Sequence, residues 1–102
     1  MTRFVYAVWY DVDPTVEAEW DRWMNSTHVP EVVDKGEFIG AKRYILREGG
    51  VAKHVTLYEA KDYASLKRYL DGPAQALRED YLRRFGEKSK LTRMVLEETY
   101  SI

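Results

Sequence analysis

Cysteine is absent from this sequence, and the formal net charge is only −1. Without cysteine the chain has no disulfide, no thiolate metal ligand and no cysteine nucleophile. Nucleic acids and anionic membranes are bound through an excess of basic residues, so the balanced charge predicts neither as a partner. These two absences exclude several classes of function before any motif is considered.

Long apolar runs are also missing. No stretch approaches the roughly 18 apolar residues of a membrane-spanning helix. The start, Met-Thr-Arg-Phe-Val-Tyr, lacks the long apolar region of a secretory signal. We therefore expect a cytoplasmic protein. The hydrophobic content of 45% and charged content of 32% are typical of a globular chain, and 102 residues predict a single domain over residues 1–102.

Four segments have the β-branched and aromatic content of strands. They cover residues 4–12, 37–47, 51–60 and 90–100. Gly49 and Gly50 separate the second segment from the third, and paired glycines supply the positive φ angles of a tight hairpin turn. With these two residues as the loop, the predicted cross-strand pairs are Ile45 with His54, Arg43 with Thr56, and Ala41 with Tyr58.

Two further segments have helical character. The first follows Asp13, a typical N-cap residue, and its apolar residues recur at helical spacing to about residue 28. We expect Pro30 to break this helix, because proline disfavours helical geometry in the residue before it. The second is capped by Asp62, is interrupted at Gly72-Pro73 and then continues.

The order strand, helix, strand, strand, helix, strand predicts an α+β fold of ferredoxin-like βαββαβ type. Right-handed crossovers place both helices on one face of a four-stranded antiparallel sheet. The strand over residues 4–12 is apolar on both faces, so the open face also needs a cover. A second copy related by a two-fold axis provides one. The sequence therefore predicts a homodimer.

Several motifs add a resemblance to this pattern. They are Trp20-x-x-Trp23-Met24, His28-Val29-Pro30-Glu31, the run from Gly36 to Tyr44, and Leu57-Tyr58-Glu59. Together with the element order and the length, they resemble the dimeric α+β-barrel superfamily, in particular its EthD-like group and related uncharacterised bacterial families. The resemblance implies dimers whose sheets face each other as a barrel. It also implies a small-molecule pocket in each protomer, between the sheet and the helices.

His28 is the sharpest catalytic candidate. Histidine exchanges protons near neutral pH, and His28 lies near Met24 on the same helix face. The expected break at Pro30 would place it at a helix end, near a pocket mouth, where Glu31 is close enough in sequence to orient it. The structural interpretation is that its ring instead hydrogen-bonds a carbonyl freed at that helix end.

His54 and Tyr58 complete the predicted catalytic set, since they share a strand face. His54 would form an acid–base couple with His28, and a tyrosine would donate a hydrogen bond to a substrate carbonyl. Two histidines without a clear carboxylate partner are a weak metal signal, so no metal site is predicted. A partly exposed strand histidine with no chemical role is the plain alternative for His54.

The predicted pocket wall is rich in aromatic residues. The residues expected to bind substrate are Tyr6, Trp9, Trp23, Met24, Arg43 and Tyr44. Most tyrosines are equally explained as good strand formers at a half-buried face. Arg43 and Arg93 lie in predicted strands, where an arginine either pairs with a carboxylate, such as Glu97, or anchors an anionic ligand.

The resulting hypothesis is a cofactor-independent isomerase, cyclase, lyase or monooxygenase. It would act by proton transfer through His28 on a small apolar molecule that is aromatic, lactone-like or polyketide-like. Two alternatives belong to other classes. One is a non-catalytic dimer that binds a small hydrophobic ligand or has a stress-related structural role. The other is a haem-dependent member of the superfamily with a histidine as axial ligand.

Overall fold

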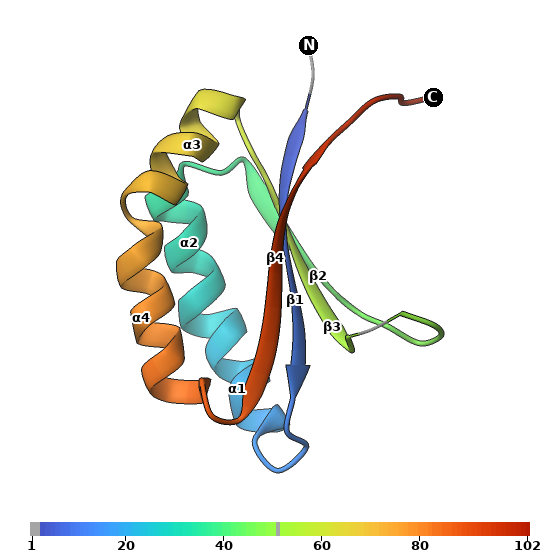
Figure 1. The fold of residues 1–102 in the computed structure, drawn as a ribbon, viewed down its shortest axis with the longest axis vertical. Coiled ribbons are helices and arrows are strands. Elements are labelled where there is room, and N and C mark those ends of the chain that lie inside the picture. The colour runs from blue at the N-terminus through green and yellow to red at the C-terminus, as the bar shows by residue number, and fades with distance from the viewer. Residues whose placement is uncertain (1–2, 51) are drawn as a thin grey trace.

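A computed structural model describes residues 3–50 and 52–102 and contains one four-stranded sheet. The strands are β1 (Phe4–Val12), β2 (Gly40–Ile45), β3 (His54–Glu59) and β4 (Ser89–Glu97). They lie in the order β2-β3-β1-β4 and every neighbouring pair is antiparallel. The helices cover one face of the sheet (Figure 1). This is the predicted ferredoxin-like arrangement, with β2, β3 and β4 shorter than expected.

The first crossover is one continuous helical segment rather than a broken one. It consists of α1 (Glu17–Trp23), a π-helical turn η1 (Met24–His28) and α2 (Val29–Gly36). The prediction that Pro30 breaks the helix is therefore wrong. In η1 the Val29 N–H donates to the carbonyl of Met24, one residue further back than in an α-helix. Because Pro30 has no N–H to donate, this wider turn absorbs the missing bond and the helix continues.

The second crossover follows the prediction closely. It comprises α3 (Tyr63–Asp71) and α4 (Ala74–Phe85), which are separated at Gly72-Pro73. The Asp62 carboxylate accepts a hydrogen bond of 2.7 Å from the backbone N–H of Ser65, as an N-cap residue does. None of the helices in the described residues is long and apolar enough to cross a membrane.

The β2–β3 hairpin has the predicted register. The pairs are Ile45 with His54, Arg43 with Thr56, and Ala41 with Tyr58. Gly49 and Gly50 have φ angles of 73° and 77°, which favour glycine. The predicted third strand began at residue 51, which lies outside the described residues.

The two faces of the sheet have different surroundings. On the helix-covered face, Tyr6, Val8 and Tyr10 of β1 pack in the main hydrophobic core with Trp20 and Met24 from the first crossover. The alternate residues of β1 point to the open face, where the pairs across to β4 include apolar side chains. These pairs are Val5 with Leu96, Ala7 with Met94, and Trp9 with Thr92.

Candidate functional site

A small cavity lies between the sheet and the helices. Its volume is about 20 Å³, which is room for about one water molecule. Its lining comes from β1, β3 and β4 on the sheet side and from η1, α2, α3 and α4 on the helix side. The lining residues are Tyr6, Val8, Tyr10, His28, Val32, Tyr58, Tyr69, Leu77, Arg78, Tyr81, Leu91 and Arg93.

His28 enters this cavity from the last residue of η1. The ring is only 7% exposed, stacks on Trp23 with ring centres 4.9 Å apart, and lies 5.6 Å from the ring centre of Tyr81. Burial lowers the pKa of His28 from 6.5 to about 4, and the charge of Asp80 opposes this shift only in part. The imidazole is therefore neutral at neutral pH, so one ring nitrogen is available to accept a proton.

Tyr58 reaches the same cavity from β3. Its side chain is 1% exposed, and burial raises its pKa well above the ordinary value, so the hydroxyl remains protonated. Within the described residues, five buried side-chain atoms lack a hydrogen-bond partner: Trp23 Nε1, Arg43 Nε, Thr56 Oγ1, Tyr58 OH and Arg78 Nε. Two of them, Tyr58 OH and Arg78 Nε, belong to residues of the cavity lining, where a bound molecule can reach them.

The hydroxyl of Tyr81, in the same lining, has hydrogen-bond partners. Trp20 Nε1 donates to its oxygen at 2.9 Å, and Ser89 Oγ lies 2.8 Å away on the other side. Ser89 in turn donates to the carbonyl of Phe85 at 2.9 Å. Tyr81 is thus part of a closed hydrogen-bond chain, whereas Tyr58 has a free hydroxyl.

The cavity opens between α4 and β4. Three lining residues are partly exposed: Arg78 on α4, and Leu91 and Arg93 on β4. All the other lining residues are buried. A molecule entering the cavity would therefore pass two guanidinium groups.

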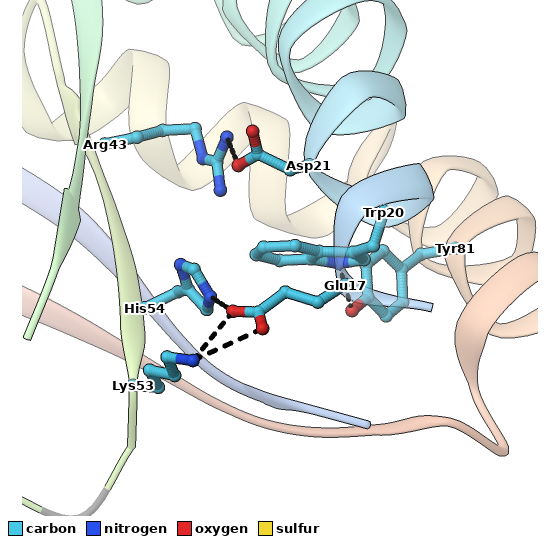
Figure 2. Close-up of polar contacts among 7 residues, drawn as sticks. All are labelled: Glu17, Trp20, Asp21, Arg43, Lys53, His54 and Tyr81. Carbon is cyan, nitrogen blue, oxygen red and sulfur yellow. Dashed lines mark hydrogen bonds and ion pairs between the residues drawn. The ribbon is translucent and has the colours of Figure 1, made fainter. Parts of the chain in front are cut away.

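His54 lies in a different cluster on the same sheet face (Figure 2). Its Nε2 is 2.6 Å from a carboxylate oxygen of Glu17, and its ring centre is 4.7 Å from that of Trp20. Lys53 also binds Glu17, at 3.1 Å. The hydrogen bonds from His54 and Lys53 lower the pKa of the Glu17 carboxyl. His54 therefore has the carboxylate partner that the sequence did not reveal, and it does not line the cavity.

Arg43 belongs to this second cluster as well. Its guanidinium lies 4.9 Å from the Trp20 ring centre and donates to Asp21 at 2.8 Å (Figure 2). It also donates to Asn25 at 2.7 Å. Of the two roles considered for this arginine, the structure contains the pairing with a carboxylate. The ring of Trp20, flanked by His54 and Arg43, holds the cluster together.

The structure brings only part of the predicted site together. His28, Tyr58 and Tyr6 line the cavity, and Trp23 supports His28 by stacking. Met24 is fully buried in the hydrophobic core and does not line the cavity. Trp9 and Tyr44 lie on the open face, because they alternate with core-facing neighbours, so they do not line a pocket between sheet and helices.

The sequence interpretation missed several lining residues. Tyr69, Leu77 and Tyr81 belong to the apolar stripes of α3 and α4, so helical spacing explained them as core. Arg78 belongs to no sequence motif that predicts a site. Arg93 lies in a predicted strand, where an arginine either pairs with a carboxylate or anchors an anion, and a sequence alone does not distinguish these roles.

The fold and this site define a ferredoxin-like α+β protein with a buried polar cavity between sheet and helices. More specifically, the chain belongs to the DUF4286 family, a domain of unknown function, whose model matches residues 3–99. No curated protein matches the chain.

Solved structures share the fold at low identity. An EthD-family protein from Bacillus halodurans is 18% identical, with 97% of this chain and 100% of that one covered and a TM-score of 0.71. A dimeric ferredoxin-like protein from an uncultured marine organism is 17% identical, with 100% of both chains covered and a TM-score of 0.69. A variant of SnoaB, a cofactor-independent oxygenase from Streptomyces nogalater, is 15% identical, with 98% and 96% covered and a TM-score of 0.70. These similarities confirm the ferredoxin-like fold and the resemblance to the EthD-like group.

Proposed function

We propose that this protein is a cofactor-independent cytoplasmic enzyme that acts by proton transfer on a small apolar molecule bound between the sheet and the helices. The molecule is aromatic, lactone-like or polyketide-like. One observation carries the proposal: a neutral histidine, His28, and a protonated hydroxyl without a partner, that of Tyr58, line one buried cavity. A proton acceptor and a hydrogen-bond donor in one enclosed space are the two groups that enolisation requires.

The proposed step begins with a carbonyl compound in the cavity. Tyr58 donates a hydrogen bond to the carbonyl oxygen, and a ring nitrogen of His28 accepts a proton from the adjacent carbon. The C–H bond breaks, an N–H bond forms, and the electron pair moves onto the oxygen that Tyr58 holds. Return of the proton to a different carbon completes an isomerisation. In a monooxygenase, the same enolate would instead react with molecular oxygen to form a hydroperoxide. Where the reacting carbon keeps a second hydrogen, this hydroperoxide loses water to leave a new carbonyl, so one oxygen atom enters the product, the other leaves as water, and the substrate supplies the electrons.

The low pKa of His28 constrains this mechanism. A base with a pKa of about 4 is weak in the empty cavity. Negative charge that develops on the substrate during proton transfer favours the imidazolium, and this attraction is strong where water is excluded. The cavity also has room for only about one water, so side chains at its mouth must move outward before a ring-sized substrate enters.

The likeness to SnoaB supports the cofactor-independent class, since that protein is described as a cofactor-independent oxygenase. At 15% identity the likeness extends to the fold alone, so the chemistry proposed here rests on His28 and Tyr58.

Deuterium exchange tests the proposal without requiring the natural substrate. The probes are 2-tetralone and 3-isochromanone, an aromatic ketone and an aromatic lactone with acidic C–H groups, followed by NMR in deuterated buffer. We expect wild-type protein to accelerate exchange at the carbon beside the carbonyl. His28→Asn should remove about a hundredfold or more of the acceleration, because it lacks the base. Tyr58→Phe should remove a smaller part.

The matched control is His54→Asn, which removes the other histidine. Its ring is engaged with Glu17 outside the cavity, so exchange should continue at the wild-type rate per folded molecule. Exchange that is no faster than in buffer, or that His28→Asn retains in full, would contradict the proposal.

A second candidate is binding of a small hydrophobic ligand without chemistry. The low pKa of His28 favours it, because a weak base serves well as a hydrogen-bond acceptor for a ligand hydroxyl. Saturable binding of the probes without any acceleration of exchange would support this function in place of the first.

We also propose that the protein works as a homodimer through the open sheet face. This face exposes large apolar side chains, including Tyr44, Met94 and Leu96. A relative of the same fold is described as dimeric. Light scattering during gel filtration should give twice the 12.0 kDa of one chain. Leu96→Lys should yield the monomer, whereas Leu82→Lys, an exposed leucine on α4, should not. A monomeric wild type would refute the dimer.

A further inference from the structure

Neither of the two arginines at the mouth of the cavity has an acidic partner among the residues that the structure describes. Within residues 3–50 and 52–102, the arginines that form ion pairs are Arg3, Arg43, Arg68, Arg83 and Arg84. Arg78 donates one hydrogen bond, of 3.3 Å, to the Tyr6 hydroxyl, and its buried Nε has no partner. Asp80, a carboxylate on α4, is engaged by Arg83 and Arg84.

A partly buried guanidinium without an acidic partner is stabilised when an anion binds it. Each guanidinium carries a fixed charge and five N–H donors, which water alone satisfies poorly in a confined space. Arg43 shows the usual solution, since the fold supplies it with Asp21. For Arg78 and Arg93 the described part of the chain supplies no carboxylate, and both line the space that a ligand would occupy.

We propose that Arg78 and Arg93 form an anion subsite that holds a carboxylate or other acidic oxygen of the substrate, separate from the carbonyl oxygen that Tyr58 holds. This inference rests on the proposed function, because it assigns a substrate class to the same cavity. Guanidinium groups match the geometry of an oxygen anion through parallel N–H donors. Five tyrosine rings in the lining suit a flat aromatic body. The substrate class is therefore an aromatic molecule that carries an acidic oxygen.

The position of the subsite also fixes the orientation of the substrate. The arginines lie at the partly exposed end of the cavity, whereas His28 and Tyr58 are buried. An anionic group held at the mouth directs the ring and the reacting carbon inward, toward the histidine. Positive charge at an entrance also attracts anionic ligands from solution.

A pair of nearly isosteric probes tests the subsite. They are 4-fluorobenzoate and 4-fluorobenzamide, whose binding is followed by fluorine NMR. We expect the wild-type protein to bind the benzoate about tenfold more tightly than the amide, the usual effect of a charge-assisted contact. Arg78→Gln and Arg93→Gln should each reduce this preference, and the double variant should abolish it.

The control is Arg22→Gln, which removes the same charge from an exposed position on α1 and should preserve the preference. Circular dichroism verifies that each variant is folded. If a glutamine variant does not fold, the lysine variant at that position replaces it. Lysine keeps the charge but lacks the planar pair of donors, so the preference should fall only in part.

The results separate this inference from the proposed function. Equal binding of both probes, no binding of either, or a preference that survives in the double variant overturns the subsite. The exchange test with neutral 2-tetralone is then still decisive for the chemistry. Conversely, arginine-dependent binding of benzoate by a protein that exchanges no ketone protons supports the subsite and contradicts the proton-transfer mechanism.

Discussion

Two polar regions lie on the helix-covered face of the sheet, and they differ in how their buried groups are satisfied. The paired cluster consists of Glu17, Trp20, Arg43, Lys53 and His54. There, His54 has Glu17 at 2.6 Å and Arg43 has Asp21 at 2.8 Å. In the cavity, by contrast, neither the Tyr58 hydroxyl nor Nε of Arg78 has a partner within the described residues.

This difference separates structural polar groups from candidate functional ones. Leaving a buried polar group unpaired costs about 1–3 kcal/mol, so folds normally supply a partner. In the paired cluster, α1, β2 and β3 supply partners for the histidine and the carboxylate, and within the described residues only Nε of Arg43 lacks one. Its histidine is therefore explained without a ligand. In the cavity lining, the described residues supply no partner for the Tyr58 hydroxyl or for Nε of Arg78, as is expected where a bound molecule completes the hydrogen bonds.

The largest expected effect that tests this comparison is the dependence of stability on pH caused by His28. Its pKa is about 4 in the folded chain and 6.5 when exposed, so between these values the unfolded chain binds a proton that the folded chain does not. This contribution to stability is complete above pH 6.5 and is lost, by about 3 kcal/mol, as the pH falls toward 4. Denaturant unfolding from pH 4 to 8 should show that His28→Asn lacks this loss.

Subtracting the stability curve of His28→Asn from that of the wild type isolates the contribution of His28, because the carboxyl groups titrate in the same way in both proteins. If the free energy of unfolding depends on pH in the same way in the wild type and in His28→Asn, His28 gains a partner in solution. The comparison between an unpaired and a paired histidine would then fail.

The next effect concerns the paired cluster. Glu17→Ala leaves Nε2 of the buried His54 without its acceptor, and we expect a loss of about 2 kcal/mol in the free energy of unfolding at pH 7. The pKa of Glu17 is lowered by its partners, so its contribution is present above the unfolded pKa and disappears as the pH falls. Urea unfolding at pH 7 and at pH 3 measures both properties.

Lys53→Ala is the matched control, because it removes the half-exposed partner of the same carboxylate. It should cost less than about 1 kcal/mol. Equal losses for the two variants would show that Glu17 acts mainly through the lysine, and His54 would no longer count as a satisfied histidine. Binding of 4-fluorobenzoate should be unchanged in both variants.

The parts of the fold that the sequence predicted correctly depend on local patterns. The hairpin register follows from Gly49 and Gly50 together with strand alternation, because the position of the turn decides which residues face each other. The cap at Asp62 follows from an interaction between residues three positions apart. Such features are contained in a short window of sequence.

The parts that were missed depend on distant contacts or on packing. Pro30 does not break its helix, because a π-helical turn accommodates it and the helix packs on the sheet. Glu17 and His54 are 37 positions apart, so no local sequence pattern predicts their pairing. Trp9 was placed in the pocket because β1 is apolar on both faces, and alternation alone does not say which face the helices cover.

The candidate site was therefore predictable only in outline. His28 was found from its residue type and its sequence context, and Tyr58 from its strand position. Arg78 lies on α4 and Arg93 on β4, and the two side chains meet at one cavity only in the folded chain. Arg93 forms no ion pair within residues 3–50 and 52–102, which only the folded chain reveals, and this property distinguishes a candidate anion-binding arginine from a paired one.

The smallest expected effect compares two tyrosines in one lining. Tyr81→Phe breaks the chain from Trp20 to Ser89 and should cost about 1.5 kcal/mol in the free energy of unfolding. Tyr58→Phe removes a hydroxyl without a partner, so the change should be less than about 0.5 kcal/mol. Thermal and urea unfolding of both variants beside the wild type measures the difference.

A loss for Tyr58→Phe as large as that for Tyr81→Phe would show that the Tyr58 hydroxyl is satisfied in the empty protein, and the proposed donor would be lost. Adding 2-tetralone, the ketone probe, sharpens the test, since a ligand that binds the folded state more tightly stabilises the protein more. The probe should stabilise Tyr81→Phe as much as the wild type, because the hydroxyl of Tyr81 is already engaged. It should stabilise Tyr58→Phe less, because the hydroxyl that is free to bind a ligand is missing.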